Sequence, residues 1–210
     1  MANFAVKQFV VGPVCTNCYF AINEKSKEMF VVDPGDQADL LAKQIEGLGV
    51  KPVAVLLTHG HFDHAGAAEA LKEKYGIPVY VHEAEKETME DPNRNLSGSM
   101  MGNPEKYSAD YFVKDGEELE IAGMKVQVLF TPGHTAGGAC YYLPNEMAVF
   151  SGDTLFCESI GRTDFPGGSA STLIRSIREK LLPLADFIKV YPGHNEITTI
   201  GNERGYNPFL

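Results

Sequence analysis

The sequence places most of its histidines directly after short apolar runs, and this arrangement constrains the fold more than any other feature. The run VAVLL at 53–57 leads straight into THGHFDH at 58–64, which holds three of the six histidines. Three further polar residues follow apolar runs in the same way, each directly after a glycine: His134, Asp153 and His194. Wholly apolar runs of this length predict strands buried in the middle of a sheet. An α/β protein gathers its functional residues in the loops after such strands.

The remaining periodicity predicts two groups of strands, each followed by helices. The first half is expected to form strands at 4–11, 18–22, 29–32, 53–57 and 79–81, with helices at 38–48 and 65–75. The second half is expected to form strands at 126–130, 140–143, 147–150 and 187–191, the last strand of the chain, with a helix at 169–182. We therefore expect an α/β (α+β) fold in which two sheets pack together with helices outside, as a single domain over residues 1–210.

Residues 84–116 interrupt this pattern. The segment is polar, holds two prolines and three glycines, and shows no clear period. It predicts a long, partly helical excursion, and long loops of this kind often carry binding function.

Composition narrows the class of protein. Hydrophobic residues make up 44% of the 210 residues and charged residues 22%, which is typical of a globular domain. The formal charge of −10 and the absence of a basic stripe argue against a nucleic-acid partner. No apolar run approaches the roughly 20 residues that a bilayer requires, and residues 1–14 do not resemble a secretory signal. We expect a cytoplasmic protein that acts on a small molecule; its oligomeric state is not predicted.

The four cysteines predict no function. Cys15 and Cys18 form a C-x-x-C, but they precede an apparent strand, whereas the redox motif opens a helix. Cys140 and Cys157 are 17 residues apart, so no second C-x-x-C completes a zinc ribbon. His82, at the end of a predicted strand, is treated as an ordinary polar residue.

Metal binding explains the placement of the other histidines best. Imidazole and carboxylate together suit zinc, iron or manganese, and the glycines beside the ligands let the backbone turn sharply. The expected ligands form two groups with one bridging carboxylate: His59, His61 and His134 for one ion, Asp63, His64 and His194 for a second, and Asp153 between them. We expect two divalent ions, with zinc favoured.

The motif at 58–64 resembles the H-x-H-x-D-H signature of the metallo-β-lactamase superfamily. His134, Asp153 and His194 match the later ligands of that family in order, and Asp33-Pro34-Gly35 is similar to its early turn. The resemblance implies an αββα sandwich with the metals at one edge of the two sheets.

Two further stretches resemble one branch of this superfamily. GRTDFPGG at 161–168 is similar to glyoxalase II and persulfide dioxygenases, and NPF at 207–209 to small bacterial glyoxalase II-like hydrolases. Longer glyoxalase II enzymes carry a C-terminal helical region that helps to hold glutathione. Few residues follow His194, so we expect that region to be missing.

The resemblance implies hydrolysis of thioesters similar to S-lactoylglutathione. A hydroxide bridging two metals would attack the carbonyl, one metal would polarise the carbonyl oxygen, and the other would accept the thiolate. Asp63 would bind metal and also orient the hydroxide or take its proton. Arg162 is expected to contact the substrate, with an ion pair to Asp164 as the alternative.

Other activities of the same fold stay open. A persulfide dioxygenase would use a single iron held by His59, His134 and Asp153, and a lactonase or β-lactamase would attack a ring carbonyl. A flavin-linked diiron oxidase is disfavoured because those proteins usually carry Glu at the position of His61. Charge and the lack of a large inserted domain disfavour an RNA-processing enzyme, and the complete ligand set disfavours a non-catalytic binding module.

Overall fold

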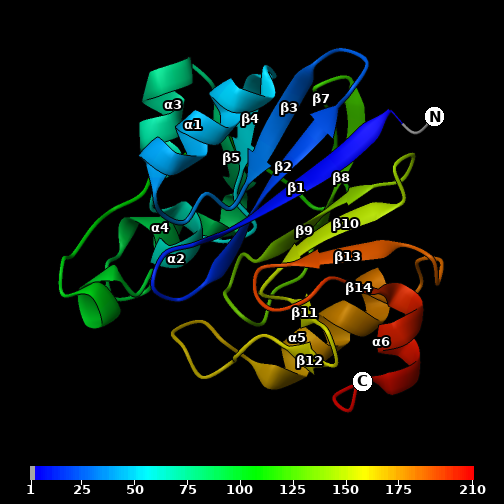
Figure 1. The fold of residues 1–210 in the computed structure, drawn as a ribbon. Helices are drawn as coiled ribbons and strands as arrows, with labels where there is room; N and C mark the ends of the chain where they lie inside the picture. Colours follow the sequence, from blue (N-terminus) through cyan, green and yellow to red (C-terminus); the bar gives the residue numbers. More distant parts are fainter. Residues whose placement is uncertain (1–2) are drawn as a thin grey trace.

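The protein, a computed structural model that describes residues 3–210, is built on two six-stranded mixed sheets packed face to face (Figure 1). The first sheet runs in sequence order: β1 (Phe4–Val11), β2 (Thr16–Asn23), β3 (Glu28–Val32), β4 (Lys51–Leu56), β5 (Val79–His82) and β6 (Tyr111–Val113). The second runs β14 (Thr198–Thr199), β13 (Lys189–Pro192), β10 (Ala148–Gly152), β9 (Ala139–Leu143), β8 (Met124–Phe130) and β7 (Glu118–Ile121). β3 to β6 pair in parallel, as do β10 and β13.

Helices cover the outer face of each sheet. α1 (Ala38–Leu48) and α3 (Ala68–Tyr75) pack on the first sheet, and α5 (Ala170–Ser176) with the π-helical turn η3 (Ile177–Leu181) packs on the second (Figure 1). The remaining elements are short: α2 (Phe62–Ala65), η1 (Glu83–Glu85), α4 (Lys86–Glu90), η2 (Ser97–Met101), β11 (Leu155–Phe156), β12 (Ser159–Ile160) and α6 (Ile200–Tyr206). The order of layers is helix, sheet, sheet, helix, which confirms the predicted αββα sandwich.

The central strands are buried on both faces, and side-chain alternation sends neighbouring residues into different layers. Along β2, Phe20 packs against α1 and α3, whereas Tyr19 packs between the sheets. Along β4, Val55 faces the helices and Leu56 faces the second sheet. This double burial explains why these strands read as continuous apolar runs.

Several predicted bounds were wrong. The helix expected at 65–75 begins only at Ala68, as α3, because the chain bends at Ala67 (φ −101°, ψ 1°) after the short helix α2, which ends at Ala65. The helix expected at 169–182 turns from α to π geometry at Ile177. The strand expected to be last is followed by β14 and α6. The helix at 38–48 has the predicted bounds.

The excursion at 84–116 is partly helical, as predicted, and it returns to the first sheet as β6. Hydrogen bonds of the Asn95 side chain hold the middle of this excursion in place. The Asn95 side chain donates to the carbonyls of Met89 and Glu105 and accepts from the amide of Ser97. No helix in the described part of the chain is long and apolar enough to cross a membrane.

One hydrogen bond joins the two sheets at the end of β4. The hydroxyl of Tyr141, a fully buried residue of β9, donates to the carbonyl of Leu57 at 2.8 Å. The Tyr141→Phe variant leaves that carbonyl without its partner, so we expect a loss of about 1–2 kcal/mol in the free energy of unfolding. Urea denaturation measures this free energy of unfolding. The matched control is Tyr142→Phe on the same strand, for which we expect less than about 0.5 kcal/mol. Equal losses in the two variants would contradict the role given to this hydrogen bond.

Candidate metal centre

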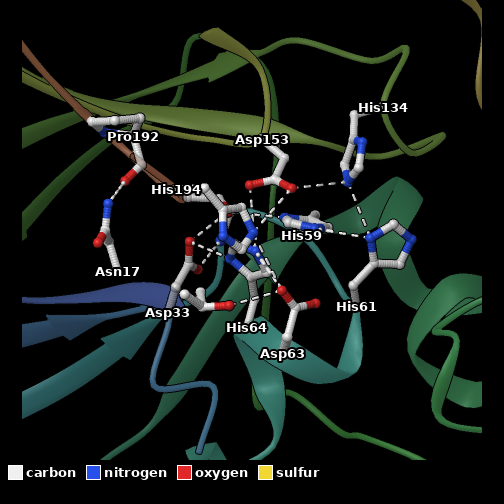
Figure 2. Close-up of polar contacts among 12 residues, drawn as sticks. Asn17, Asp33, His59, His61, Asp63, His64, His134, Asp153, Pro192 and His194 are labelled. Atoms are coloured by element: carbon white, nitrogen blue, oxygen red, sulfur yellow. Dashed lines mark hydrogen bonds and ion pairs between the residues drawn. The ribbon is translucent and has the colours of Figure 1, made fainter. Parts of the chain in front are cut away.

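All seven predicted ligands lie together where the ends of several strands meet (Figure 2). Their ligating atoms form three overlapping groups, and within each group the atoms lie within 4.8 Å of one another. The groups are His59, His61 and His134; Asp63, His64 and His194; and His59, His64 and Asp153. The two groups predicted from spacing are therefore present, and the third joins them.

Asp63 and His64 do not lie in a loop, as expected, but in the short helix α2. His61, in extended conformation, is the residue before the helix, and its carbonyl accepts hydrogen bonds from the amides of His64 and Ala65. The helical turn sends Asp63 and His64 to the side of the cluster opposite His61 and His134 (Figure 2).

Three imidazole nitrogens converge in the first group. His61 Nδ1 lies 3.1 Å from His59 Nε2 and 3.0 Å from His134 Nε2. His134 Nδ1 faces the carbonyl of Arg162 at 2.7 Å, so this nitrogen carries the proton and Nε2 is free to accept. Burial lowers the pKa of His61 to about 3 and also lowers the pKa of His59. Neutral imidazole is the form that binds metal.

One carboxylate and two imidazoles form the second group, and the carboxylate of Asp153 lies beside them. His64 Nε2 lies 3.4 Å from Asp63 Oδ2 and 3.4 Å from Asp153 Oδ1. His194 Nε2 lies 3.3 Å from Asp63 Oδ2 and 3.5 Å from Asp153 Oδ2. Burial alone would raise the pKa of Asp63, but the charge of His64 and a hydrogen bond from His194 outweigh it and hold the pKa at about 2.

Asp153 lies between the two groups. Its Oδ2 is 3.5 Å from both His134 Nε2 and His194 Nε2, while its Oδ1 faces His64. Burial would raise the pKa of Asp153, yet the charge of the neighbouring His64 lowers it overall. Asp153 thus presents Oδ2 to His134 in the first group, and it presents Oδ1 to His64 and Oδ2 to His194 in the second group. A carboxylate shared in this way suits a bridging ligand.

Buried polar atoms without hydrogen-bond partners indicate whether cations fit this cluster. Among the described residues, four buried side-chain polar atoms have no hydrogen-bond partner, and three of them belong to this cluster: His61 Nε2, His64 Nε2 and Asp153 Oδ1. Buried polar atoms are normally paired because leaving them unpaired costs free energy. A set of imidazoles and carboxylates around such atoms fits a binuclear site for divalent cations.

Asp33 was interpreted as a turn residue, but it also positions the ligands. It is buried, and its carboxylate accepts from the Thr58 amide at 2.8 Å, from the Thr58 hydroxyl at 2.7 Å and from His64 Nδ1 at 2.9 Å. The contact to Nδ1 turns His64 Nε2 toward the cluster. Carboxylates that orient metal-binding histidines in this way are common in metal sites.

Glu85 was not identified from the sequence. It is fully buried and accepts hydrogen bonds from the Gly60 amide at 3.1 Å, the Gly137 amide at 2.8 Å and the Thr135 hydroxyl. Burial raises the pKa of Glu85, and these hydrogen bonds oppose that shift. Glu85 thus joins the loop of His59 and His61 to the loop that follows His134. It lies in a glutamate-rich stretch where no local pattern marks one residue as buried.

The loop of His194 is held by β2. Asn17 donates to the carbonyls of Pro192 and Asn195, each at 3.0 Å, and the Tyr19 hydroxyl donates to Pro192 at 2.7 Å. The hydroxyl of Thr16 donates to Asp63 Oδ2 at 2.8 Å. The polar residues of the C-x-x-C segment therefore support the cluster, while its cysteines are free thiols.

Two glycines beside the ligands are needed because neighbouring atoms pack closely against them, and not because the backbone turns there. Gly60 and Gly193 lack a positive φ, in contrast to Gly133 (φ +132°) and Gly152 (φ +48°). A Cβ at Gly193 would overlap Asp153 Oδ1, so the ligand itself occupies the space that a side chain would need.

Arg162 forms the ion pair with Asp164 that was the alternative interpretation. Its guanidinium pairs with Asp164 at 3.0 and 2.7 Å and stacks on the Phe165 ring at 4.3 Å. It also lines the cleft beside His61 and His134. His82 stands apart from the cluster and stacks on Phe130, as an ordinary buried residue.

Comparisons with known proteins agree on the family. Residues 11–194 match the family model of the metallo-beta-lactamase superfamily. The hydroxyacylglutathione hydrolase GloC of Haemophilus influenzae is 40% identical over 92% of this chain and 92% of its own length. The BLEG-1 B3 metallo-beta-lactamase has a TM-score of 0.94 at 42% identity, covering 98% of this chain and 99% of that one. TTHA1623, solved in a di-iron-bound form, has a TM-score of 0.86 at 36% identity, covering 97% and 100%.

The hydrogen bonds of Asp33 generate a prediction about metal affinity. In Asp33→Asn an NH2 group, which accepts no hydrogen bond, replaces one carboxylate oxygen. The side chain can then no longer accept from both Thr58 donors and His64 at once, so we expect metal affinity to fall roughly 10–100-fold. Competition with a chromophoric chelator measures this. The control is Asp36→Asn in the same turn, an exposed residue whose carboxylate accepts from the Gln37 amide and from no other donor in residues 3–210. Unchanged affinity in Asp33→Asn would show that His64 is oriented without Asp33.

Proposed function

The chain belongs to the metallo-beta-lactamase superfamily of metallo-hydrolases, and on that premise we propose that it hydrolyses thioesters similar to S-lactoylglutathione. The observation that carries the proposal is the pair of three-residue ligand groups joined by Asp153 beside an open cleft. The likeness to GloC, a hydroxyacylglutathione hydrolase, supports a thioester as the substrate.

In this proposal the seven side chains would hold two divalent cations. His59, His61 and His134 would hold one, Asp63, His64 and His194 would hold the other, and Asp153 would be a ligand available to both. When bound, the two cations supply a hydroxide nucleophile at neutral pH and stabilise negative charge on a carbonyl oxygen. We propose zinc, and the di-iron form of TTHA1623 makes iron the first alternative.

The chain's own residues orient the reacting groups. Asp63 is ionised, because its pKa is about 2, and it accepts from the Thr16 hydroxyl. It can therefore accept a hydrogen bond from the attacking water and orient it. Arg162 lies at the rim of the cleft, but its guanidinium is already paired with Asp164, so contact with a substrate carboxylate would require this pair to break.

The two alternative reactions each have one supporting observation. The loop at 161–165 resembles persulfide dioxygenases, and its Arg162 carbonyl fixes His134. A single-iron enzyme would leave the second group without a role, although Asp33 orients His64 as firmly as Arg162 orients His134. The likeness to BLEG-1, a B3 metallo-beta-lactamase, supports attack on a ring carbonyl by the same site.

We expect the purified protein to release thiol from S-lactoylglutathione, to carry about two metals per chain, and to lose activity on chelation and in His59→Ala. His82→Ala, outside the cluster, is the control and should keep its metals. Thiol release and elemental analysis provide the measurements. A single iron with oxygen uptake on glutathione persulfide would instead establish the dioxygenase. Hydrolysis of a chromogenic cephalosporin without thioester turnover would establish a lactamase.

Asp63→Asn tests the role of the carboxylate beyond metal binding. An amide presents a single acceptor oxygen, so we expect kcat to fall by roughly 10²–10⁴ even in protein reloaded to two metals per chain. Steady-state kinetics with metal counting measure this. Near-normal kcat with both metals bound would limit Asp63 to holding the metal.

A further inference from the structure

The cleft over the metal centre is lined by apolar side chains from five separate places in the chain. Its volume is about 230 Å³, and the lining residues other than the metal ligands and Arg162 are Val14, Phe62, Leu96, Met100, Phe156 and Phe165. Phe165 lies edge-on to His61 at 5.6 Å, and Phe156 lies edge-on to His194 at 6.0 Å. Both ends of the metal cluster are therefore bordered by an aromatic ring.

The excursion supplies one wall of this cleft in a fixed position. The Asn95 carbonyl accepts a hydrogen bond from the Phe62 amide, inside the metal-binding motif, at 2.9 Å. Leu96 follows in left-handed conformation (φ 67°, ψ 1°), which a non-glycine residue adopts at a cost in free energy. Leu96 is only 5% exposed, whereas Met100, one turn on, is 53% exposed beside the opening. The strained backbone keeps an apolar side chain against the site.

The charged side chains that line the cleft also indicate which substrates it can bind. Among its described lining residues Arg162 is the one cation, and that guanidinium is already paired with Asp164 and stacked on Phe165. Glutathione carries two carboxylates and an ammonium group, and this cleft offers no unpaired cation for either carboxylate. A volume of about 230 Å³ also lies below the roughly 300–1,000 Å³ typical of pockets for larger ligands.

We propose that the natural substrate is a compact thioester whose thiol part is uncharged and apolar, and that Leu96 and Met100 determine this specificity. The inference rests on the proposed thioester hydrolysis. With a small acyl group over the metals, the rest of the substrate has to cover the apolar wall. Burial of hydrocarbon against this wall, rather than pairing with Arg162, then supplies the binding free energy.

Two substrates with the same acyl group test the proposal. We expect kcat/KM for the S-lactoyl thioester of benzyl mercaptan to exceed that for S-lactoylglutathione at least ten-fold. Equal or higher kcat/KM for the glutathione thioester would overturn the inference while leaving thioester hydrolysis in place. Hydrolysis of neither thioester by protein with two metals bound would instead refute the proposed function.

Variants of the wall test it independently. Met100→Ser should raise KM for the benzyl thioester about five-fold, since it removes apolar surface, and leave kcat unchanged. Leu96→Asn removes apolar surface with a residue that tolerates left-handed backbone, so it should fold and raise KM at least as much. The control is Met101→Ser, whose side chain is 49% exposed and lines a neighbouring cavity. The same change in KM for both thioesters, or in Met101→Ser, would contradict a specificity role.

A binding measurement tests the inference even if the protein hydrolyses neither thioester. Calorimetry on the metal-loaded protein would compare benzyl 2-hydroxypropyl thioether with S-(2-hydroxypropyl)glutathione, neither of which can be hydrolysed. We expect the benzyl thioether to bind at least ten-fold more tightly, with a negative heat-capacity change, and to lose affinity in Leu96→Asn. Tighter binding of the glutathione thioether would overturn the inference whatever the protein hydrolyses.

Discussion

Seven polar side chains crowd together at the shared edge of two apolar sheets, and the fold has to hold them there against the cost of burial. Five are imidazoles and two are carboxylates, and three of their buried polar atoms have no hydrogen-bond partner. Buried polar groups without partners destabilise a protein, so the surrounding structure has to prevent the loops from separating. The cluster in turn offers a cation several ligands that already point inward.

Three polar residues hold the loops from outside, and each joins distant parts of the chain. Asp33 binds Thr58 and His64 across 25 and 31 positions, and Glu85 binds Gly60 and Gly137 across 25 and 52. Asn17 reaches Pro192 across 175 positions. Each contact fixes the backbone or ring of a ligand segment, which is how a metal site keeps its geometry without relying on the metal alone. The cleft above the cluster has a similar support, because Asn95 fixes the excursion that carries Leu96.

Much of the fold followed from patterns that are local in the chain. Runs such as 53–57 predicted buried strands because both faces of those strands are covered, and the spacing of leucines at 38–48 gave a helix with the observed bounds. The errors arose where tertiary contacts override local preference. The bend at Ala67 lies beside Gly66, where a side chain would overlap the Gly35 carbonyl, so packing against the turn of Asp33 decides where α2 ends.

The sequence by itself predicted the ligand set and its division into two groups, and the structure brings these residues together. The residues of each group lie within a few positions of one another after β4 or follow a strand of the second sheet, so the packing of the two sheets brings them together. Only the tertiary structure decided what orients them. Asp33 and Glu85 act through hydrogen bonds across at least 25 positions, and no local pattern separates a buried glutamate at 85 from the exposed glutamates around it. The apolar wall at Leu96 could not be predicted from the sequence either, because the direction of the Leu96 side chain depends on its own left-handed backbone and on the hydrogen-bond partners of Asn95.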